Sequence, residues 1–361
     1  SYPEYIYEQT KDKIRIVVGG SHGKTTITSM ILHVFNGAGI DCDFMVGAQL
    51  QGFDTMVKLT KEARIAVLEG DEYLASPIDR RPKFHLYHPN IAIISGIAWD
   101  HINVFPTFDN YVDQFRKFIG LIEQDGTLIF NSADPELLKL SAETGIKKLP
   151  YDVPEHIIEN GVTSLLTLKG KVTLQVFGKH NLMNLNGARL VCNAVGLSDE
   201  QFYFHISTFK GASKRLELVK KSRDVAFYKD FAHSPSKLKA TTQAVKEQFP
   251  DRSLIACMEL HTFSSLNEAF LKEYHDSMAL ADEAIIYYNP HVIAHKKLQP
   301  ITKEQVLVAF GASSNLSVFT SSGDVLMELR KKTWKNITLL MMSSGNFDGI
   351  DYPTLANEIM P

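Results

Sequence analysis

Residues 20–26 read Gly-Ser-His-Gly-Lys-Thr-Thr, a stretch whose glycines, lysine and threonines could together bind the phosphates of a nucleotide. Glycine-bearing turns bring backbone N–H groups close to phosphate oxygens, and a helix that starts there adds its dipole. In this arrangement Lys24 would reach the β- and γ-phosphates of ATP, and the Thr25 hydroxyl would coordinate Mg²⁺. We therefore expect ATP and Mg²⁺ as cofactors. The common phosphate-loop pattern has a glycine where Val18 stands, which weakens a match to generic kinases and GTPases.

Other polar side chains follow other apolar runs. Three carboxylates beginning with Glu69 follow the run at 64–68, and His101 follows the run at 91–95. Taken alone, the carboxylates could be a solvated loop, and a lone histidine is more often structural than a ligand. However, the carboxyl ends of neighbouring parallel strands lie at one edge of a sheet. We therefore expect Thr25, Glu69 and His101 to converge on a site for a hard cation such as Mg²⁺.

Three further segments carry groups that suit a nucleotide. His180, Asn181 and Asn184 open a helical stretch and could hold a base or ribose, although an asparagine there could equally be a helix cap. Arg215 could reach a phosphate or could belong to a surface pair. Asp230 follows an apolar run and precedes a helix, so it could accept a hydrogen bond from a ribose hydroxyl.

The elements that must position these groups follow from the apolar pattern. Near-continuous apolar runs separated by helical patterns predict a parallel sheet covered on both faces. Between 163 and 177 the pattern changes to two alternating strands, which predicts an antiparallel hairpin at the sheet edge, and a helix is expected over about 182–195. The predicted parallel strands are 14–18, 64–68, 91–95 and 127–130.

The alternation of strands and helices restarts after residue 210. We therefore expect two α/β domains, residues 1–210 and residues 211–361. The strands predicted in the second domain are 225–229, 254–258, 284–288, 317–320 and 338–342.

Composition excludes several classes of protein. The 361 residues include 44% apolar ones, enough for real cores, and the net charge of −3 offers no general attraction for nucleic acid or an anionic membrane. The apolar runs are too short for a membrane span. Cys42, Cys192 and Cys257 are odd in number and widely spaced, so we expect buried reduced thiols in a cytoplasmic protein.

Taken in order, these motifs resemble the signature of the Mur ligases over roughly residues 13 to 350. Within the family, four segments look most similar to the murein peptide ligases. Those enzymes attach L-alanyl-γ-D-glutamyl-meso-diaminopimelate to UDP-N-acetylmuramate, and the sister ligases that add L-alanine are close behind. The four segments are Glu69–Tyr73, Asp79–Phe84, Asp230–His233 and Met342–Ile350.

The resemblance implies a bacterial cytoplasmic enzyme with an N-terminal UDP-binding domain, a central ATPase domain and a C-terminal Rossmann-like domain. Residues 1–210 look like the central domain, with its P-loop and mostly parallel sheet, and residues 211–361 look like the C-terminal one. By this resemblance, we expect the UDP-binding domain to be absent from this sequence. We therefore expect this chain to bind ATP and Mg²⁺ and to lack most of the surface that contacts UDP.

The resemblance also implies a role for each motif in forming an acyl phosphate that the amine then attacks. Lys24 would hold the phosphates, Thr25 and Glu69 one Mg²⁺, and His101 a second metal. Arg215 would contact phosphate and Asp230 the ribose. The residues expected to bind the cofactor are Gly20, Ser21, His22, Gly23, Lys24, Thr25, Thr26, His180, Asn181, Asn184, Arg215 and Asp230.

Three positions depart from the family pattern. Several relatives carry a carbamylated lysine where Arg116 stands, so that role is not carried over; Ser234 replaces a histidine of sister ligases, and Gly96 replaces an asparagine. Two other functions remain open. A folylpolyglutamate-synthase-like ligase would usually have asparagine at His22, and an ATP-dependent switch protein would have the phosphate loop without a second substrate.

Overall fold

The computed structural model describes residues 1–48, 53–99, 104–212 and 215–360. Its contacts divide the chain into two compact units. Unit 1 comprises residues 1–157 and 162–213, and unit 2 comprises residues 158–161 and 214–361.

A seven-stranded sheet with the order β3-β2-β4-β1-β5-β6-β7 forms the centre of unit 1. All neighbouring strands are parallel except β2 and β3. The buried apolar runs predicted as strands are therefore confirmed, and β1 lies between β4 and β5. The strands are β1 Ile14–Gly19, β2 Asp43–Met45, β3 Val57–Lys58, β4 Ile65–Glu69, β5 Ile91–Ile94, β6 Thr127–Asn131 and β7 Lys147–Tyr151.

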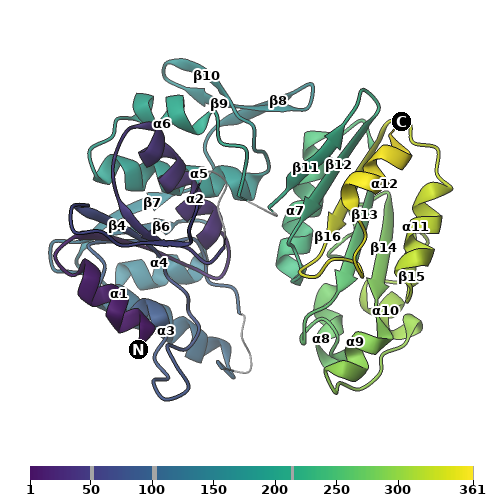
Figure 1. Ribbon diagram of the computed structural model, residues 1–361, viewed down its shortest axis with the longest axis horizontal. Helices are drawn as coiled ribbons and strands as arrows, with labels where there is room; N and C mark the ends of the chain where they lie inside the picture. The colour runs from purple at the N-terminus through teal and green to yellow at the C-terminus, as the bar shows by residue number, and fades with distance from the viewer. Residues whose placement is uncertain (49–52, 100–103, 213–214, 361) are drawn as a thin grey trace. The chain divides into compact units, whose positions relative to one another are not determined.

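Helices cover both faces of this sheet (Figure 1). One core joins the sheet to α2, α5 and α6, and the other joins it to α1, α3, α4 and the 3₁₀ helix η1. The helix that follows β1 is α2, and it begins at Lys24, within the predicted phosphate loop. The helices are α1 Tyr2–Thr10, α2 Lys24–Gly37, η1 Lys83–Leu86, α3 Phe108–Gly120, α4 Pro135–Ala142, α5 Lys179–Ala194 and α6 Asp199–Ile206.

The predicted hairpin forms, but its predicted place was wrong. Strand β9 (Val162–Thr167) lies between β10 (Gly170–Thr173) and β8 (His156–Glu159) in a separate three-stranded sheet. The inward side chains of this sheet, such as Leu165, join the core beneath α2 and α5. A strand whose apolar and polar residues alternate needs only one of its faces covered. Here the apolar face of the hairpin packs on the helical layer, and the hairpin does not extend the main sheet.

Unit 2 contains a six-stranded sheet with the order β11-β12-β16-β13-β14-β15. Its pairs are parallel except for β11 with β12. Helix α7 packs on β13 and β16, while the core of the other face includes residues of α11 and α12. The strands are β11 Glu217–Lys221, β12 Val225–Asp230, β13 Ser253–Leu260, β14 Glu283–Tyr288, β15 Leu316–Phe319 and β16 Ile337–Met342. The helices are α7 Pro235–Gln248, α8 Glu268–Leu271, η2 Lys272–Tyr274, α9 Pro290–His295, α10 Lys303–Ala309, α11 Ser322–Arg330 and α12 Tyr352–Ile359.

Two expectations from composition can be compared with the structure. All three cysteines are buried and free, as predicted. No helix in the described part of the chain is long and apolar enough to cross a membrane.

Candidate functional site

The loop between β1 and α2 has the shape of a phosphate-binding turn. Gly23 caps the helix with φ of 82°, a left-handed conformation that favours glycine. A Cβ atom at Gly23 would lie 2.5 Å from Asn184 Oδ1, so the loop packs directly against the start of α5. The structure thus places Asn184, one of the predicted nucleotide residues, beside the loop.

Hydrogen bonds tie the loop to the segment that follows β5. The backbone N–H of Ser21 donates to the carbonyl of Gly96 at 3.0 Å, and the Ser95 hydroxyl donates to the carbonyl of His22. Because β5 is the neighbour of β1, this segment leaves the sheet at the same edge as the loop. The two segments therefore hold one another in place.

Thr25 and Glu69 lie together at the same edge, as their positions after neighbouring strands predicted. The Thr25 hydroxyl donates to Glu69 Oε1 at 2.9 Å, and the backbone N–H of Gly47 donates to Glu69 Oε2 at 2.9 Å. A hydroxyl and a carboxylate are oxygen ligands of the kind that Mg²⁺ prefers, so the pair fits the expected metal. The third predicted ligand, His101, lies outside the described residues.

The Lys24 ammonium is held between the loop and an acidic side chain. Its Nζ donates to the carbonyl of Gly20 at 2.7 Å and lies 2.5 Å from Glu72 Oε2. Burial opposes the charged form, but the carboxylate of Glu72, and after it those of Asp71 and Glu69, raise the pKa of Lys24 overall. Lys24 is therefore a cation in a protected position.

The start of α5 supplies the other predicted residues of unit 1. The Asn181 side chain is buried and donates to the carbonyl of Phe177 at 2.9 Å, so it braces the turn before the helix. His180 is half-buried, and burial lowers its pKa to about 4. A histidine with this pKa is neutral at pH 7 and can both donate and accept a hydrogen bond.

Arg215 and Asp230 lie next to one another in unit 2. The Asp230 carboxylate accepts the backbone N–H groups of Leu216 and Ala232, each at 2.6 Å, and the Arg215 guanidinium lies 4.8 Å from the centre of the Phe231 ring. Burial raises the pKa of Asp230, whereas the Arg215 charge and the two N–H groups lower it. Asp230 thus shapes the backbone beside Arg215 and keeps lone pairs for a further donor.

A second group of polar side chains in unit 2 gathers where β13 and β16 end. Glu259 is buried and accepts hydrogen bonds from the Ser343 hydroxyl and from the backbone N–H of Phe347, the latter at 2.8 Å. Asp348, which is exposed, accepts from the Tyr287 hydroxyl at 2.6 Å. Phe347 and Asp348 are both left-handed, with φ of 51° and 54°. The loop is therefore held in a strained shape with a carboxylate facing solvent.

Comparison with known proteins identifies the family. Residues 18–192 match the Mur ligase middle domain, and residues 214–345 match the Mur ligase glutamate ligase domain. The chain belongs to the Mur ligase family. Members of this family are ATP-dependent ligases that form amide bonds.

Named relatives and solved structures of the family resemble the chain over most of its length. A UDP-N-acetylmuramate–L-alanine ligase of Cytophaga hutchinsonii is 26% identical over 357 residues, which cover 95% of this chain and 74% of the relative. A murein peptide ligase of Psychrobacter arcticus superposes with a TM-score of 0.65 and 24% identity, covering 100% of this chain and 81% of that one. The MurF ligase of Thermotoga maritima in complex with ADP gives a TM-score of 0.74 at 15% identity, with 99% and 82% covered. Across eight curated relatives, all named UDP-N-acetylmuramate–L-alanine ligases, the chain spans between 60% and 76% of the relative's length.

Among the departures from the Mur ligase pattern, Arg116 is exposed on the surface of unit 1. The Arg116 guanidinium lies 2.8 Å from Glu143 and 3.4 Å from Asp113, and about half of its side chain is exposed. These contacts make Arg116 part of a surface ion-pair network on α3. In the described part of the chain, its recorded partners are carboxylates rather than the phosphate loop.

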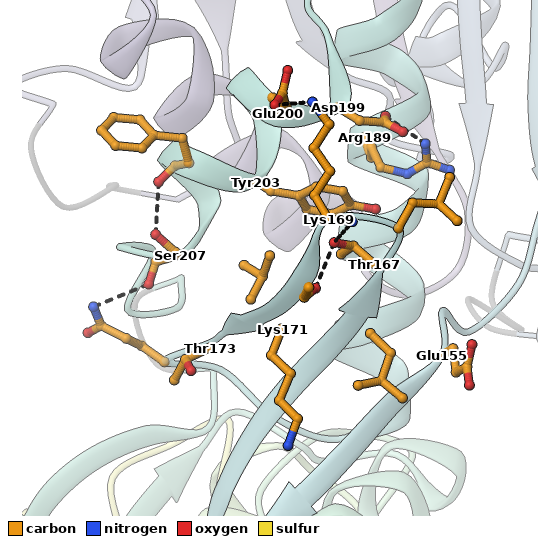
Figure 2. A pocket seen from close by; sticks show the side chains of 16 residues that line it. Glu155, Thr167, Lys169, Lys171, Thr173, Arg189, Asp199, Glu200, Tyr203 and Ser207 are labelled. Carbon is orange, nitrogen blue, oxygen red and sulfur yellow. Dashed lines mark hydrogen bonds and ion pairs between the residues drawn. The ribbon is translucent and has the colours of Figure 1, made fainter.

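A hollow of about 1200 Å³ in this Mur ligase is surrounded by the side chains that Figure 2 shows. It is lined by the β9–β10 hairpin, α5 and α6, and its rim carries the ion pairs Lys169–Glu200 and Arg189–Asp199. None of its lining residues belongs to the predicted site. We therefore do not assign the nucleotide to this hollow, although it is large.

The sequence did not indicate roles for two buried residues of the candidate site, Glu72 and Tyr111. Glu72, only 1% exposed, belongs to the run of carboxylates noted in the sequence, and its ion pair with Lys24 would have required the fold to predict. Tyr111 reaches Glu72 and Ser21 from α3. An aromatic residue on the apolar stripe of a helix has the pattern of an ordinary core residue.

Proposed function

We propose that the protein containing this chain joins UDP-N-acetylmuramate to L-alanyl-γ-D-glutamyl-meso-diaminopimelate at the cost of ATP. One observation carries the proposal: a Lys24 side chain that is only 14% exposed, in a phosphate-loop turn beside the bonded pair of Thr25 and Glu69. A cation for the phosphates and oxygen ligands for Mg²⁺ are what phosphoryl transfer to a carboxylate requires. The motifs that resemble murein peptide ligases support the tripeptide as the amine.

The reaction has two steps. A muramyl carboxylate oxygen attacks the γ-phosphorus of ATP, the bond to the β,γ-bridging oxygen breaks, and ADP leaves. The peptide amine nitrogen then attacks the acyl phosphate carbon, phosphate leaves from the tetrahedral intermediate, and the nitrogen loses a proton.

Lys24 would neutralise charge that develops on the transferring phosphoryl group, which brings together two anions that otherwise repel. Thr25 and Glu69 would hold Mg²⁺, which when bound neutralises phosphate charge; His101 is proposed to support a second metal.

The remaining predicted residues would position the nucleotide. His180, Asn181 and Asn184 are proposed to contact it from unit 1. From unit 2, Arg215 is proposed to contact phosphate and Asp230 the ribose, which follows from the resemblance and from the polar groups that each presents. We place the reaction in the bacterial cytoplasm.

The amine would bind to unit 2 where β13 and β16 end. In open α/β sheets, ligands bind outside the carboxyl ends of the strands. The exposed Asp348 carboxylate and the Glu259-braced loop lie at that edge and supply acceptors for an ammonium group. This location supports the proposal that amine choice depends on Glu259–Ser265 and Ser343–Phe347.

L-alanine is the second candidate amine, because several curated relatives that are 26–28% identical to the chain are named UDP-N-acetylmuramate–L-alanine ligases. The test offers both amines in competition to the complete protein with ATP and UDP-N-acetylmuramate. We expect ADP to form only when acceptor and amine are both present, and the tripeptide to be consumed first.

Other outcomes would support other functions. Preference for L-alanine would support the biosynthetic ligase, and glutamate addition to a folate would support the folylpolyglutamate-synthase-like alternative. ADP formation that ignores both acceptor and amine would support a switch protein.

A further inference from the structure

Four side chains of unit 1 form a buried chain of hydrogen bonds from Lys24 to the segment after β5. Glu72 Oε2 lies 2.5 Å from Lys24 Nζ, and Glu72 Oε1 accepts from the Tyr111 hydroxyl at 3.3 Å. The Tyr111 hydroxyl lies 2.8 Å from the Ser21 hydroxyl, which is 2.9 Å from the backbone N–H of Ala98.

Chemistry fixes the direction of this chain. The Glu72 carboxylate can only accept, so the single hydroxyl proton of Tyr111 goes to Glu72 and the Tyr111 oxygen accepts from the Ser21 hydroxyl. The Ser21 oxygen in turn accepts from the backbone N–H of Ala98. The other oxygen of Glu72 accepts from Lys24. Every donor thus has an acceptor, and the sequence of bonds ends on a carboxylate paired with a cation.

Burial makes each link matter. Tyr111 is 0% exposed and Glu72 1% exposed, so neither group can exchange its partner for bulk water. A buried polar group left without a partner is costly, which favours one arrangement of the whole chain. The same carboxylate limits where the Lys24 ammonium can lie.

Lys24 has three N–H groups. Two of them are directed to the carbonyl of Gly20 and to Glu72. With two donors committed inside the protein, the third has a restricted direction in which to meet a phosphate oxygen.

We propose that Glu72, Tyr111 and Ser21 form a positioning relay that orients the Lys24 ammonium and couples it to the backbone at Ala98. Glu72 and Tyr111 act through Lys24 and are positioning residues. A test of the relay by kcat rests on the proposed ligase function, whereas the orientation of the Lys24 ammonium can be measured without catalysis.

The test compares Glu72→Gln, Tyr111→Phe and their double variant in the complete protein. Tyr111→Phe keeps the buried ring and removes only the hydroxyl. Tyr87→Phe is the matched control, because Tyr87 is equally buried in the same core and its hydroxyl contacts the Met45 sulfur at 3.8 Å.

We expect kcat to fall about tenfold in Glu72→Gln and about threefold to tenfold in Tyr111→Phe, with KM for ATP changed by less than about threefold. The double variant should lose no more than Glu72→Gln alone, because the two changes interrupt one relay. Tyr87→Phe should match the wild type and combine with Glu72→Gln multiplicatively.

Two results would overturn the relay. The first is that Tyr111→Phe has the same kcat as Tyr87→Phe. The second is that the fold reduction of kcat in the double variant equals the product of the reductions in the two single variants. Should Glu72→Gln fail to fold, the comparison of the two tyrosine variants decides.

The chemical shift of the Lys24 ammonium, measured by nuclear magnetic resonance, tests the relay without turnover. Its signal should move in Tyr111→Phe and stay in place in Tyr87→Phe. An unmoved signal in both contradicts the relay, and an inactive wild type with a moved signal contradicts only the ligase function.

Discussion

Thr25 donates a 2.9 Å hydrogen bond to Glu69, a residue 44 positions later in the chain. The bond exists because β4 pairs with β1 in a register that sets Glu69 opposite Val18. The loop that follows β1 then leads to Thr25 at the start of α2. The sheet thus brings a hydroxyl and a carboxylate to the place where the phosphate loop enters α2.

Removal of the Thr25 hydroxyl should lower the apparent affinity of the enzyme for Mg²⁺. Thr25→Val keeps the volume of the side chain and deletes the hydroxyl, so we expect the Mg²⁺ concentration for half-maximal rate to rise about tenfold. A titration of initial rate against Mg²⁺ measures this. Thr25→Ser retains the oxygen and should behave as wild type; an unchanged midpoint in Thr25→Val would exclude the metal role.

Lys24→Ala should reduce ADP formation by about a hundredfold or more, because it removes the cation from the phosphate loop. It should also lower the free energy of unfolding by about 1–3 kcal/mol, since the buried Glu72 carboxylate would lose the cation that it is paired with. Kinetics and urea denaturation measure the two effects. The double variant with Glu72→Gln should regain stability without activity, whereas restored turnover would refute the assignment of Lys24.

Gly23→Ala should destabilise the protein by about 2 kcal/mol or more, because left-handed strain adds to a clash with Asn184. Gly39→Ala is the matched control, since Gly39 is also left-handed, with φ of 70°, but has open space around its missing side chain. It should cost only about 1 kcal/mol. Chemical denaturation compares the two, and equal losses would show that contact with Asn184 is unimportant.

Acidification should destabilise unit 1 through His180. Its pKa is about 4 in the folded protein and about 6.5 unfolded, so the unfolded chain binds more protons between these values. This contribution is present above pH 6.5 and is lost as the pH falls towards 4. Its size is at most about 3 kcal/mol, and less because the ring is only half-buried.

Denaturation at pH 7.5 and 4.5 compares the wild type with His180→Gln. The wild type should lose more stability than the variant on acidification. Parallel losses in the two proteins would mean that His180 titrates normally.

The sequence predicted those parts of the fold that depend on local pattern. Continuous apolar runs located the central strands correctly, but β2 and β3 are too short for a periodicity to develop. Helix α6, which begins after Ser198, was not predicted. Its start is a capping box of Ser198 and Gln201, a signal that the sequence does contain.

The candidate site was predictable to the extent that strand ends determine it. Thr25 and Glu69 met as expected, since both follow neighbouring strands. The contacts of Tyr111 depend on how α3 packs against the sheet, which no local pattern reveals. His101 and the roles assigned to the other residues remain predictions.

The position of β1 in the centre of its sheet also bears on how the chain is made. Both strands that pair with it, β4 and β5, come later in the sequence. During synthesis the phosphate loop therefore leaves the ribosome before either strand that supports it, and folding of this region must wait until about Ile94 has emerged. Such long-range pairing slows folding, so we expect the newly made loop to pass through a period in which it cannot yet hold a nucleotide.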